Sequence, residues 1–377
     1  MSRPLRIGLV GSGFMGRSHA LAWRMAPAVF DLPVRPEVVV LADRTEELAA
    51  QAARQLGIPR ATGDWRDVIR DPEIDLVDIT TPNALHKEMA LAAIEAGKAV
   101  YCEKPLAPTA TDARDLTEAA ENAGLPTFVG FNYLRNPMTR LARDLVSSGE
   151  IGEPWNFRGI HAEDYMSDPG VPWSWRLDPA GGAGAVADLG SHIIAMARFV
   201  VGPIEELVAD IDTVIPERAI TRGGAPARPV EVDDQARALV RFANGAAGTI
   251  EASWVSTGRK MHLAFELTGS KGSIVLNMER MNELRLFVKG QAAGRAGFVE
   301  IPAGPEHADY AAFCPAPGHQ LGFNEIKAIE VKDIALAMAE GPTFRPDFRE
   351  AYEVQRVVDA VLLSARERRW VSVDEVG

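Results

Sequence analysis

The sequence contains little cysteine: Cys102 and Cys314 are its only two. Two cysteines do not make the disulfide framework of a small secreted domain, and they match no zinc-binding pattern. We therefore expect both to be reduced thiols in a reducing compartment.

Basic residues are also scarce relative to acidic ones, since 40 Lys and Arg stand against 52 Asp and Glu, a net charge of −12. This balance argues against a nucleic-acid partner, which needs a basic face on the protein. No apolar run approaches the roughly 20 residues that cross a bilayer, so we expect no membrane partner. A first strand begins near Leu5, which leaves no room for a signal peptide. We expect a cytoplasmic protein.

The first motif in the chain is a glycine-rich turn. Residues 5–10 read Leu-Arg-Ile-Gly-Leu-Val, and residues 11–16 follow as Gly-Ser-Gly-Phe-Met-Gly. In a dinucleotide-binding turn the first glycine permits the tight bend, the second admits a pyrophosphate, and the third lets helix and strand pack closely. The phosphates then lie at the helix N-terminus, which favours anions. The motif predicts a nicotinamide or flavin cofactor bound by Gly11, Gly13, Phe14, Met15 and Gly16.

The first part of the chain alternates strands and helices. Apolar runs that read as further strands occupy residues 37–42, 75–80, 99–102 and 126–130, and helix-forming stretches occupy 46–56, 85–96 and 112–123. Such alternation predicts a parallel sheet with helices on both faces. Because 377 residues exceed one ordinary core, we expect residues 1–132 to form a Rossmann dinucleotide-binding domain of α/β class.

The pattern changes near residue 150, where strands begin to alternate apolar and polar residues. Asn244 and Gly245 form a strong hairpin signal between two of them. The expected strands are residues 236–243, 247–255, 263–268, 273–276, 284–288 and 298–301, with a long loop over 290–320 and helices over 323–340 and 347–365. We expect residues 133–345 to form an α+β domain with an open, mainly antiparallel sheet. The segment 346–377 is expected to pack back near the N-terminal domain as a helix.

Asp43 stands at the end of the second strand and bears on the choice of nucleotide. An acidic residue there accepts hydrogen bonds from the ribose hydroxyls of NAD and repels the 2′-phosphate of NADP. The distance from Gly16 to Asp43 exceeds the usual about 20 residues, which we ascribe to a loop insertion over residues 27–36. Alternatively, Asp43 caps the next helix, and Arg44 could pair with a 2′-phosphate. We predict NAD, with NADP less favoured.

Lys104 lies directly after the strand at residues 99–102, between Glu103 and Pro105. Ligands of open α/β sheets bind outside the carboxyl ends of the strands, so Lys104 is placed to reach a bound nicotinamide. A lysine there can donate a hydrogen bond to an alcohol or carbonyl oxygen, or stabilise a developing alkoxide. The alternative is a solvated surface charge.

A second glycine-rich segment, residues 181–192, ends with Asp188 and His192 four residues apart. This spacing places both side chains on one face of a helix. Glycine is costly in a helix, so its density suggests that a ligand or another backbone approaches closely. An Asp beside a His can fix the imidazole tautomer or stabilise its cation. The alternative is a polar pair on a solvated face.

Taken in order, these motifs resemble the Gfo/Idh/MocA family of NAD(P)-dependent oxidoreductases. The set consists of the glycine-rich turn, Thr81-Pro-Asn83 with His86, Glu103-Lys104-Pro105, and Asp188 with His192. The resemblance covers nearly the whole chain. Residues 161–165, with Trp173 and Trp175, resemble the segment of levoglucosan dehydrogenase-like and inositol dehydrogenase-like members. It implies oxidation of a secondary hydroxyl of a sugar, anhydrosugar or cyclitol, or the reverse reduction. It also implies that Lys104, Asp188 and His192 are the catalytic residues, with no metal.

The resemblance implies further contacts and an oligomer. Its cofactor contacts, besides those of the glycine-rich turn, are Asp43, Arg44, Thr80, Pro82, Asn83, His86, Glu103, Lys104, Asn132, Trp175 and Arg176. Its substrate contacts are Lys104, Tyr133, Tyr165, Trp175, Arg176, Asp188 and His192. Aromatic faces with nearby charges suit a polyhydroxylated ring, although Trp173 and Trp175 could instead plug a core. The open sheet implies a homodimer or homotetramer.

We expect hydride transfer in which His192 removes the hydroxyl proton, with Asp188 holding or assisting it, while Lys104 binds the same oxygen. Two alternatives stay open at this point. One is a redox-neutral glycosidase of the same fold, which oxidises the sugar transiently and leaves NAD unchanged. The other is a non-catalytic NAD sensor that binds a partner protein, which would have no need for an intact Lys104, Asp188 and His192.

Overall fold

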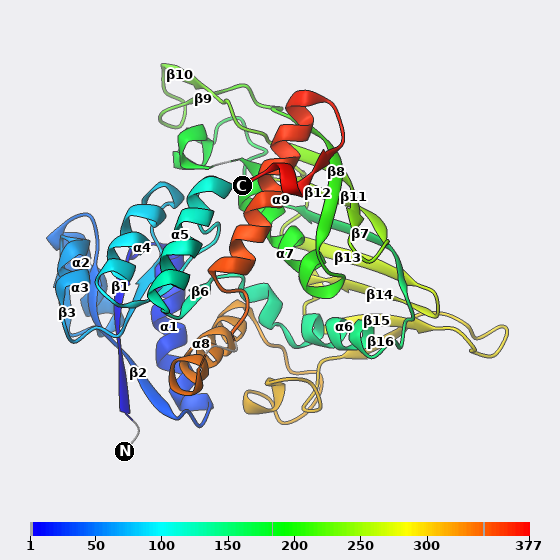
Figure 1. The fold of residues 1–377 in the computed structure, drawn as a ribbon, viewed down its shortest axis with the longest axis horizontal. Coiled ribbons are helices and arrows are strands. Elements are labelled where there is room, and N and C mark those ends of the chain that lie inside the picture. Colours follow the sequence, from blue (N-terminus) through cyan, green and yellow to red (C-terminus); the bar gives the residue numbers. More distant parts are fainter. Residues whose placement is uncertain (1–2, 183, 342–343) are drawn as a thin grey trace. The chain divides into compact units, whose positions relative to one another are not determined.

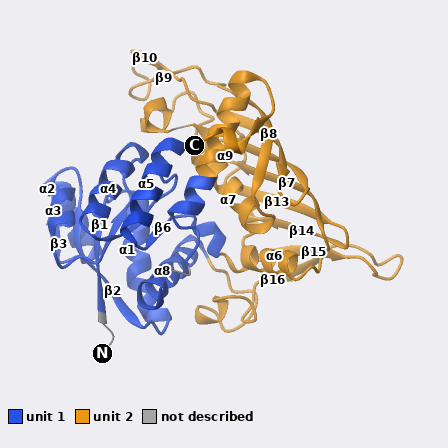
Figure 2. Ribbon diagram, viewed as in Figure 1, with its two compact units in different colours: residues 1–135, 322–353 blue, residues 136–321, 354–377 orange. Residues whose placement is uncertain are grey.

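The computed structural model describes residues 3–182, 184–341 and 344–377, which pack as two units (Figure 2). Unit 1 consists of Met1–Arg135 and Gly322–Glu353, and unit 2 of Asn136–Leu321 and Val354–Gly377. The division at Arg135 lies close to the boundary drawn from sequence at 132. The helix at 323–340, however, packs with unit 1, whereas the sequence reading assigned it to the second domain. The docking of residues 346–377 near the N-terminal domain stays a prediction.

Unit 1 is built on a six-stranded sheet in the order β3-β2-β1-β4-β5-β6, with every pairing parallel (Figure 1). Its strands are β1 (Arg3–Val10), β2 (Val34–Ala42), β3 (Arg60–Thr62), β4 (Leu76–Ile79), β5 (Ala99–Cys102) and β6 (Thr127–Val129). The order reverses between β1 and β4, which is where a doubly wound sheet opens a crevice for a ligand. The predicted Rossmann domain with a parallel sheet is confirmed.

Helices cover this sheet because each crossover between parallel strands carries one. They are α1 (Phe14–Val29), α2 (Glu46–Leu56), α3 (Trp65–Arg70), α4 (His86–Glu95), α5 (Ala110–Ala123) and α8 (Phe323–Glu340). Helix α1 packs on α2 and α8, while α4 packs on α3 and α5. Helix α9 (Phe348–Glu367) begins in unit 1 and continues into unit 2.

Two features of unit 1 differ from those predicted from the sequence. The short elements β3 and α3 were not anticipated, because three and six residues give too little periodicity. The expected loop insertion over residues 27–36 is wrong: α1 continues through Pro27 to Val29, and β2 begins at Val34. Pro27 lies in the last turn of α1 and removes one backbone hydrogen bond there, but the Phe30 N–H still closes the helix on the Ala26 carbonyl. The wide spacing from Gly16 to Asp43 therefore reflects a long helix.

Unit 2 contains a nine-stranded sheet in the order β16-β15-β14-β13-β7-β12-β11-β8-β17 (Figure 1). Only the β7–β12 pairing is parallel among these, so the predicted open, mainly antiparallel sheet is confirmed. Its strands are β7 (Pro154–Ala162), β8 (Ile204–Asp212), β11 (Gln235–Phe242), β12 (Ala247–Ser253), β13 (His262–Gly269), β14 (Gly272–Asn277), β15 (Glu283–Val288), β16 (Val299–Pro302) and β17 (Val371–Ser372). The β11–β12 hairpin turns at Gly245, whose φ of 87° suits glycine.

One face of this sheet packs against helices, and the other alternates with exposed side chains. Helix α6 (Pro137–Ser147) lies on β14 and β15, and α7 (Ser191–Val200) lies on β7, β12 and β13. A separate two-stranded sheet pairs β9 (Glu217–Ala219) with β10 (Ala227–Pro229). Along β11 every second residue is buried, as expected for a sheet with one covered face.

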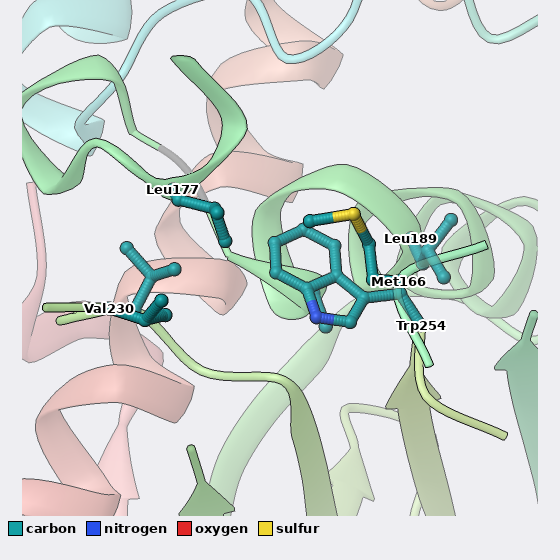
Figure 3. Packing of buried hydrophobic residues seen from close by; sticks show 7 residues of the cluster. Met166, Leu177, Leu189, Val230 and Trp254 are labelled. Carbon is teal, nitrogen blue, oxygen red and sulfur yellow. The ribbon is translucent and has the colours of Figure 1, made fainter. Parts of the chain in front are cut away.

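A compact apolar cluster in unit 2 surrounds Trp254, which is fully buried. Figure 3 shows Met166 lying against the indole ring, with Leu189 beside them and Leu177 and Val230 on the other side. Leu177 closes a short turn, η3 (Trp175–Leu177), and Leu189 belongs to η5 (Val186–Gly190). The cluster therefore anchors two short turns that carry predicted site residues.

One helical stretch among the described residues, Pro179–Val200, is long and apolar enough to cross a membrane by length and composition. The expectation that no run approaches that length was therefore too strict. Most of its apolar window, 82%, is buried inside the protein, which is typical of a core helix. Residue 183, part of the glycine-rich segment, lies outside the described residues.

Candidate functional site

In the glycine-rich turn of unit 1, the first and last glycines face nearby atoms, whereas the middle glycine faces open space. Gly11 has φ of 101°, and a Cβ there would lie 2.8 Å from Thr80 Oγ1. A Cβ at Gly16 would overlap the Gly11 carbonyl oxygen. A Cβ at Gly13, in contrast, would meet no described atom within 4 Å. This pattern fits the requirements of a pyrophosphate, which must approach the backbone at the middle glycine.

Helix α1 begins at this turn without a side-chain cap, as far as the described residues show. Helices α2 and α5 are capped instead by Thr45 and Thr109, which accept hydrogen bonds from Leu48 N and Asp112 N. The first turn of α1 also contains no acidic residue. Its amide groups and the positive end of the helix dipole are thus suited to an anionic ligand.

Asp43 lies against the glycine-rich turn. Its Oδ2 accepts hydrogen bonds from the Ser12 backbone N–H at 3.0 Å and from the Ser12 hydroxyl, and its Oδ1 accepts one from Arg44 N at 2.7 Å. The alternative that Asp43 caps the next helix is wrong, because Thr45 caps α2. Arg44 is exposed. Asp43 therefore lies beside the glycine-rich turn, and its contact with a ribose stays a prediction.

The loop after β4 supports the turn from the other side. The Thr80 hydroxyl donates to the carbonyls of Val10 at 3.0 Å and Gly11 at 3.1 Å. The buried His86 ring lies within 2.9 Å of two backbone carbonyls, those of Thr81 and Pro105, and burial lowers the pKa of this ring. His86 thus joins two loops at the carboxyl edge of the sheet. Direct contacts of Thr80, His86, Pro82 and Asn83 with a cofactor stay predictions.

Lys104 and Asn132 lie at the same edge, after β5 and β6. Glu103 Oε2 accepts a hydrogen bond from the Lys104 backbone N–H at 3.2 Å. Asn132 is buried, and its Nδ2 has no hydrogen-bond partner among the described residues. A buried amide donor rarely lacks an acceptor. The open space at Gly13 and the unmatched donor of Asn132 both fit the predicted dinucleotide. Tyr133 follows, with its ring 6.1 Å from that of Phe323.

The second predicted set lies in unit 2 on a helix that begins with a π turn. Asp188 belongs to η5, a π-helical segment, and His192 to the first turn of α7. π turns are rare and occur often at functional sites. His192 is buried, and its ring lies 5.5 Å from that of His161, which contacts the Leu189 carbonyl at 2.9 Å and Glu163 Oε1 at 3.2 Å.

Asp188 is held by two side chains that the sequence reading assigned to substrate. The Tyr165 hydroxyl donates to Asp188 Oδ2 at 2.7 Å, and Arg176 Nε approaches the same oxygen at 3.3 Å. Burial, followed by the charge of Asp188, raises the pKa of Tyr165 well above its ordinary value, so this hydroxyl stays a donor. The structure thus brings Tyr165, Arg176 and Asp188 together.

The aromatic residues of this region divide into two kinds. Trp175 is 36% exposed, with the Arg176 guanidinium 4.5 Å from its ring centre. Trp173 packs against the apolar cluster around Trp254, and the Arg228 guanidinium lies 3.6 Å from its ring. The core-plug interpretation therefore suits Trp173, while Trp175 presents a face to solvent.

In the segment 181–192, one glycine is required by a neighbouring side chain of the protein. Gly184 has φ of 107°, and a Cβ there would overlap Asp233 Oδ1. The Asp233 carboxylate accepts a hydrogen bond from Val186 N at 2.8 Å and so caps the π turn. Burial raises the pKa of Asp233 to about 6. Asp233 was not predicted from the sequence, because its position after Val232 is the only sign there of an internal role.

Lys104 belongs to unit 1 and the Asp188–His192 pair to unit 2, so their convergence on one substrate oxygen stays a prediction. Within the described residues no group of three or more His, Cys, Asp or Glu is arranged to hold a metal ion. The fold and the two sets of residues define a nucleotide-dependent oxidoreductase: a sheet edge shaped for a dinucleotide, a lysine at that edge, and a buried histidine four residues after a carboxylate on another helix.

Comparison with known proteins agrees with this class. Residues 5–131 match the model described as "Oxidoreductase family, NAD-binding Rossmann fold", and residues 139–275 match the "GFO/IDH/MocA C-terminal domain". The chain is 41% identical over 385 aligned positions to a levoglucosan dehydrogenase of Pseudarthrobacter phenanthrenivorans, covering 99% of each protein. The chain belongs to the Gfo/Idh/MocA family of oxidoreductases, and its first domain binds NAD.

Other relatives show the breadth of the similarity. A solved structure of levoglucosan dehydrogenase in complex with NADH and levoglucosan is 41% identical with a TM-score of 0.95, covering 98% of this chain and 100% of the other. An oxidoreductase domain protein from Kribbella flavida is 40% identical with a TM-score of 0.94, covering 99% and 100%. A scyllo-inositol 2-dehydrogenase (NAD(+)) of Bacillus subtilis is 28% identical over 91% of this chain and 89% of its own.

Proposed function

We propose that this protein oxidises a secondary hydroxyl of an anhydrosugar of the levoglucosan type, using NAD. The coarser prediction, hydride transfer between NAD and a hydroxyl of a sugar, anhydrosugar or cyclitol, is confirmed by the relatives described above. The observation that carries the narrower proposal is the group around Asp188. It combines a partly exposed indole, a guanidinium and a phenol at a half-buried carboxylate, which suits a compact, hydroxyl-rich ring with apolar C–H patches.

NAD, when bound, supplies the nicotinamide carbon that accepts the hydride. The residues suited to hold it are the glycine-rich turn with Phe14 and Met15, then Asp43, and Asn132 through its unmatched amide donor. With these residues as its contacts, we expect the phosphates at the uncapped end of α1 and a ribose near Asp43. Discrimination against NADP through the Asp43 carboxylate is part of the proposal.

In the proposed reaction Lys104 donates a hydrogen bond to the reacting oxygen and stabilises the negative charge that develops there. His192 accepts the hydroxyl proton as general base. Asp188 orients or assists His192, while Tyr165 and Arg176 hold its Oδ2.

The test measures NADH formation by the purified protein with NAD and a panel containing levoglucosan, other sugars and inositols. Stoichiometric NADH with levoglucosan at the highest kcat/KM supports the proposal. A product sugar released while NAD stays unchanged would support the redox-neutral glycosidase. Tight NADH binding with no turnover of any member would support the sensor. Preference for an inositol over levoglucosan would contradict the substrate class.

Two substitutions test the proposed roles. His192→Ala should lower kcat by roughly 10²–10⁴-fold, because a general base is lost. Lys104→Ala should bind NADH like the parent and be nearly inactive. His319→Ala and Lys289→Ala, at exposed positions of unit 2, are the matched controls and should keep the parent kcat. Parental turnover by His192→Ala or Lys104→Ala would remove that residue from the mechanism.

We further propose a homo-oligomer formed through the outer face of the nine-stranded sheet. That face carries Leu239, which is 52% exposed, together with Ile160 and the paired charges of Arg158 and Glu266. We expect Leu239 and Ile160 to lie in the apolar centre of this contact and the charged residues at its rim. Light scattering should report a dimer or tetramer, and Leu239→Glu should shift it toward monomer. A monomeric parent protein would overturn this proposal.

We also propose a cytoplasmic location, because Cys102 and Cys314 are both free thiols. Fractionation of the native host tests it, and recovery outside the cytoplasm would contradict it. The absence of a nucleic-acid partner stays a prediction from the net charge of −12, and the absence of a membrane partner stays a prediction as well.

A further inference from the structure

Unit 1 contains a cluster of ionisable side chains beneath Lys104 that the proposed mechanism does not use. Its members come from four elements and are all buried: His19, Asp78, Tyr101, Glu103, Lys327 and Glu330. His19 belongs to α1, Asp78 to β4, and the two α8 residues lie three apart on one face. Three carboxylates, one ammonium and one imidazole are thus concentrated at the carboxyl edge of the sheet.

His19 bridges two of these carboxylates. Its Nδ1 lies 2.8 Å from Asp78 Oδ1, and its Nε2 lies 2.8 Å from Glu103 Oε1. Ionised carboxylates only accept hydrogen bonds, so both ring nitrogens must donate, and the ring must be an imidazolium. Burial acts against this charge, but the carboxylates, Asp78 first, outweigh it and raise the pKa of His19 above its usual value.

Lys327 completes the environment of Glu103. Its Nζ lies 3.0 Å from Glu103 Oε1, 2.7 Å from Glu330 Oε2 and 3.2 Å from the Tyr101 hydroxyl, which itself donates to Glu330. The three N–H groups of the ammonium therefore all have acceptors. Although burial opposes ionisation, Lys327 and His19 lower the pKa of Glu103 well below its usual range.

The two oxygens of Glu103 have different partners. Oε1 accepts from His19 and Lys327, while Oε2 accepts from the Lys104 backbone N–H at 3.2 Å. Gly130, after β6, leaves the space that this carboxylate occupies, since a Cβ there would lie 2.5 Å from Oε1. The backbone of Lys104 is therefore connected through one carboxylate to α1 and α8.

Stability alone does not account for this cluster. Removing several charges from water costs more than their mutual attraction commonly returns, and apolar replacements of buried ion networks are often neutral or stabilising. The cluster's position offers the explanation, because catalytic groups must be held to within a fraction of an ångström, and a displacement of 1 Å can lower a rate by about 10².

We propose that His19 and Glu103 are positioning residues for Lys104. The imidazolium and the Lys327 ammonium hold one oxygen of Glu103, and the other oxygen holds the Lys104 amide, so that the lysine side chain starts from a fixed point at the sheet edge. This inference rests on the proposed function, which places Lys104 at the reacting oxygen.

The experiment compares His19→Gln and Glu103→Gln with the control Trp23→Phe. Trp23 is equally buried in α1, donates to Asp78 Oδ2 at 2.7 Å and packs edge-on against Tyr101, but the hydrogen bonds to Glu103 come from His19, Lys327 and the Lys104 amide. A glutamine at position 19 carries its N–H groups at one end, so it cannot donate to Asp78 and Glu103 on opposite sides. A glutamine at position 103 must point its NH₂ group either at His19 and Lys327 or at the Lys104 N–H, all of which are donors. For each variant, kcat with levoglucosan and NAD, the NADH Kd and Tm are measured.

We expect both glutamine variants to lose at least about tenfold in kcat with an NADH Kd within about threefold of the parent. Trp23→Phe should keep kcat within about threefold even where its Tm falls as far as theirs.

Parental kcat in a folded His19→Gln or Glu103→Gln protein would overturn the inference and leave the proposed function intact. An equal loss of kcat in Trp23→Phe would also overturn it, as would a parallel loss of NADH binding. If one glutamine variant does not fold, the other decides. A parent protein inactive on the whole panel would overturn both.

Discussion

The two glycine-rich segments look alike in sequence, but their glycines are needed for different reasons. At residues 11–16, the backbone requires Gly11 and Gly16, while Gly13 faces open space. At residues 181–192, Gly184 is needed because the Asp233 carboxylate fills the space beside it. The first segment keeps room for a ligand, and the second uses its room for an internal cap. Glycine density thus signals close approach, but only coordinates show what approaches.

The largest expected difference concerns stability. Gly184→Ala should destabilise the protein by about 3–4 kcal/mol, because a positive φ and an overlap with Asp233 add together. Gly190→Ala is the matched control, since Gly190 is helical and a Cβ there would meet Ala252 at an ordinary 3.4 Å. It should be neutral or slightly stabilising. Urea unfolding measures both, and equal stabilities would contradict our interpretation of Gly184.

The second prediction concerns the pH dependence of the internal cap. Burial raises the pKa of Asp233 from 3.8 to about 6. The favourable contribution of protonated Asp233 to the free energy of unfolding is therefore fully present below pH 3.8 and is lost as the pH rises through about 6. This amounts to at most about 3 kcal/mol. The stability difference between the parent and Asp233→Asn should therefore change between pH 4 and 7. A constant difference across that range would show that Asp233 does not titrate there.

The third prediction concerns the open glycine. Gly13→Ala should weaken NADH binding at least about tenfold, or about 1.4 kcal/mol, because the methyl group would occupy the space assigned to pyrophosphate. Its Tm should stay near that of the parent, since nothing in the described structure fills that space. Gly297→Ala, which also faces open space but in unit 2, should change neither quantity. A Gly13→Ala protein with parental NADH affinity would place the phosphates elsewhere.

The smallest expected effect sharpens the nucleotide assignment beside the first segment. Asp43→Ala should shift the ratio of kcat/KM for NADP over NAD upward by about fivefold, because a partly exposed charge contributes up to about 1 kcal/mol. Loss of the Ser12 contacts should loosen the turn slightly and raise KM for NAD as well. An unchanged ratio would mean that Asp43 supports the turn without selecting the nucleotide.

Local patterns predicted those features that short stretches of chain specify. The helix at 46–56 and the strand at 99–102 have the bounds expected from sequence, since a capping threonine and a run of buried residues define them. The loop over 27–36 was wrong because helix propensity and a proline gave conflicting local signals. The network of His19, Glu103 and Lys327 could not be foreseen, because its bonds join residues up to 224 positions apart.

The sequence by itself determined the class of this protein, because the turn after β1, the strand-end lysine and the Asp188–His192 spacing are short motifs whose chemistry follows from neighbouring residues. Only the tertiary structure decided which glycine is open to a ligand, that Asp233 closes the other segment, and that a buried imidazolium lies behind Lys104. The physical reason is that steric fit and buried charge depend on atoms brought together from distant parts of the chain, which no local pattern encodes.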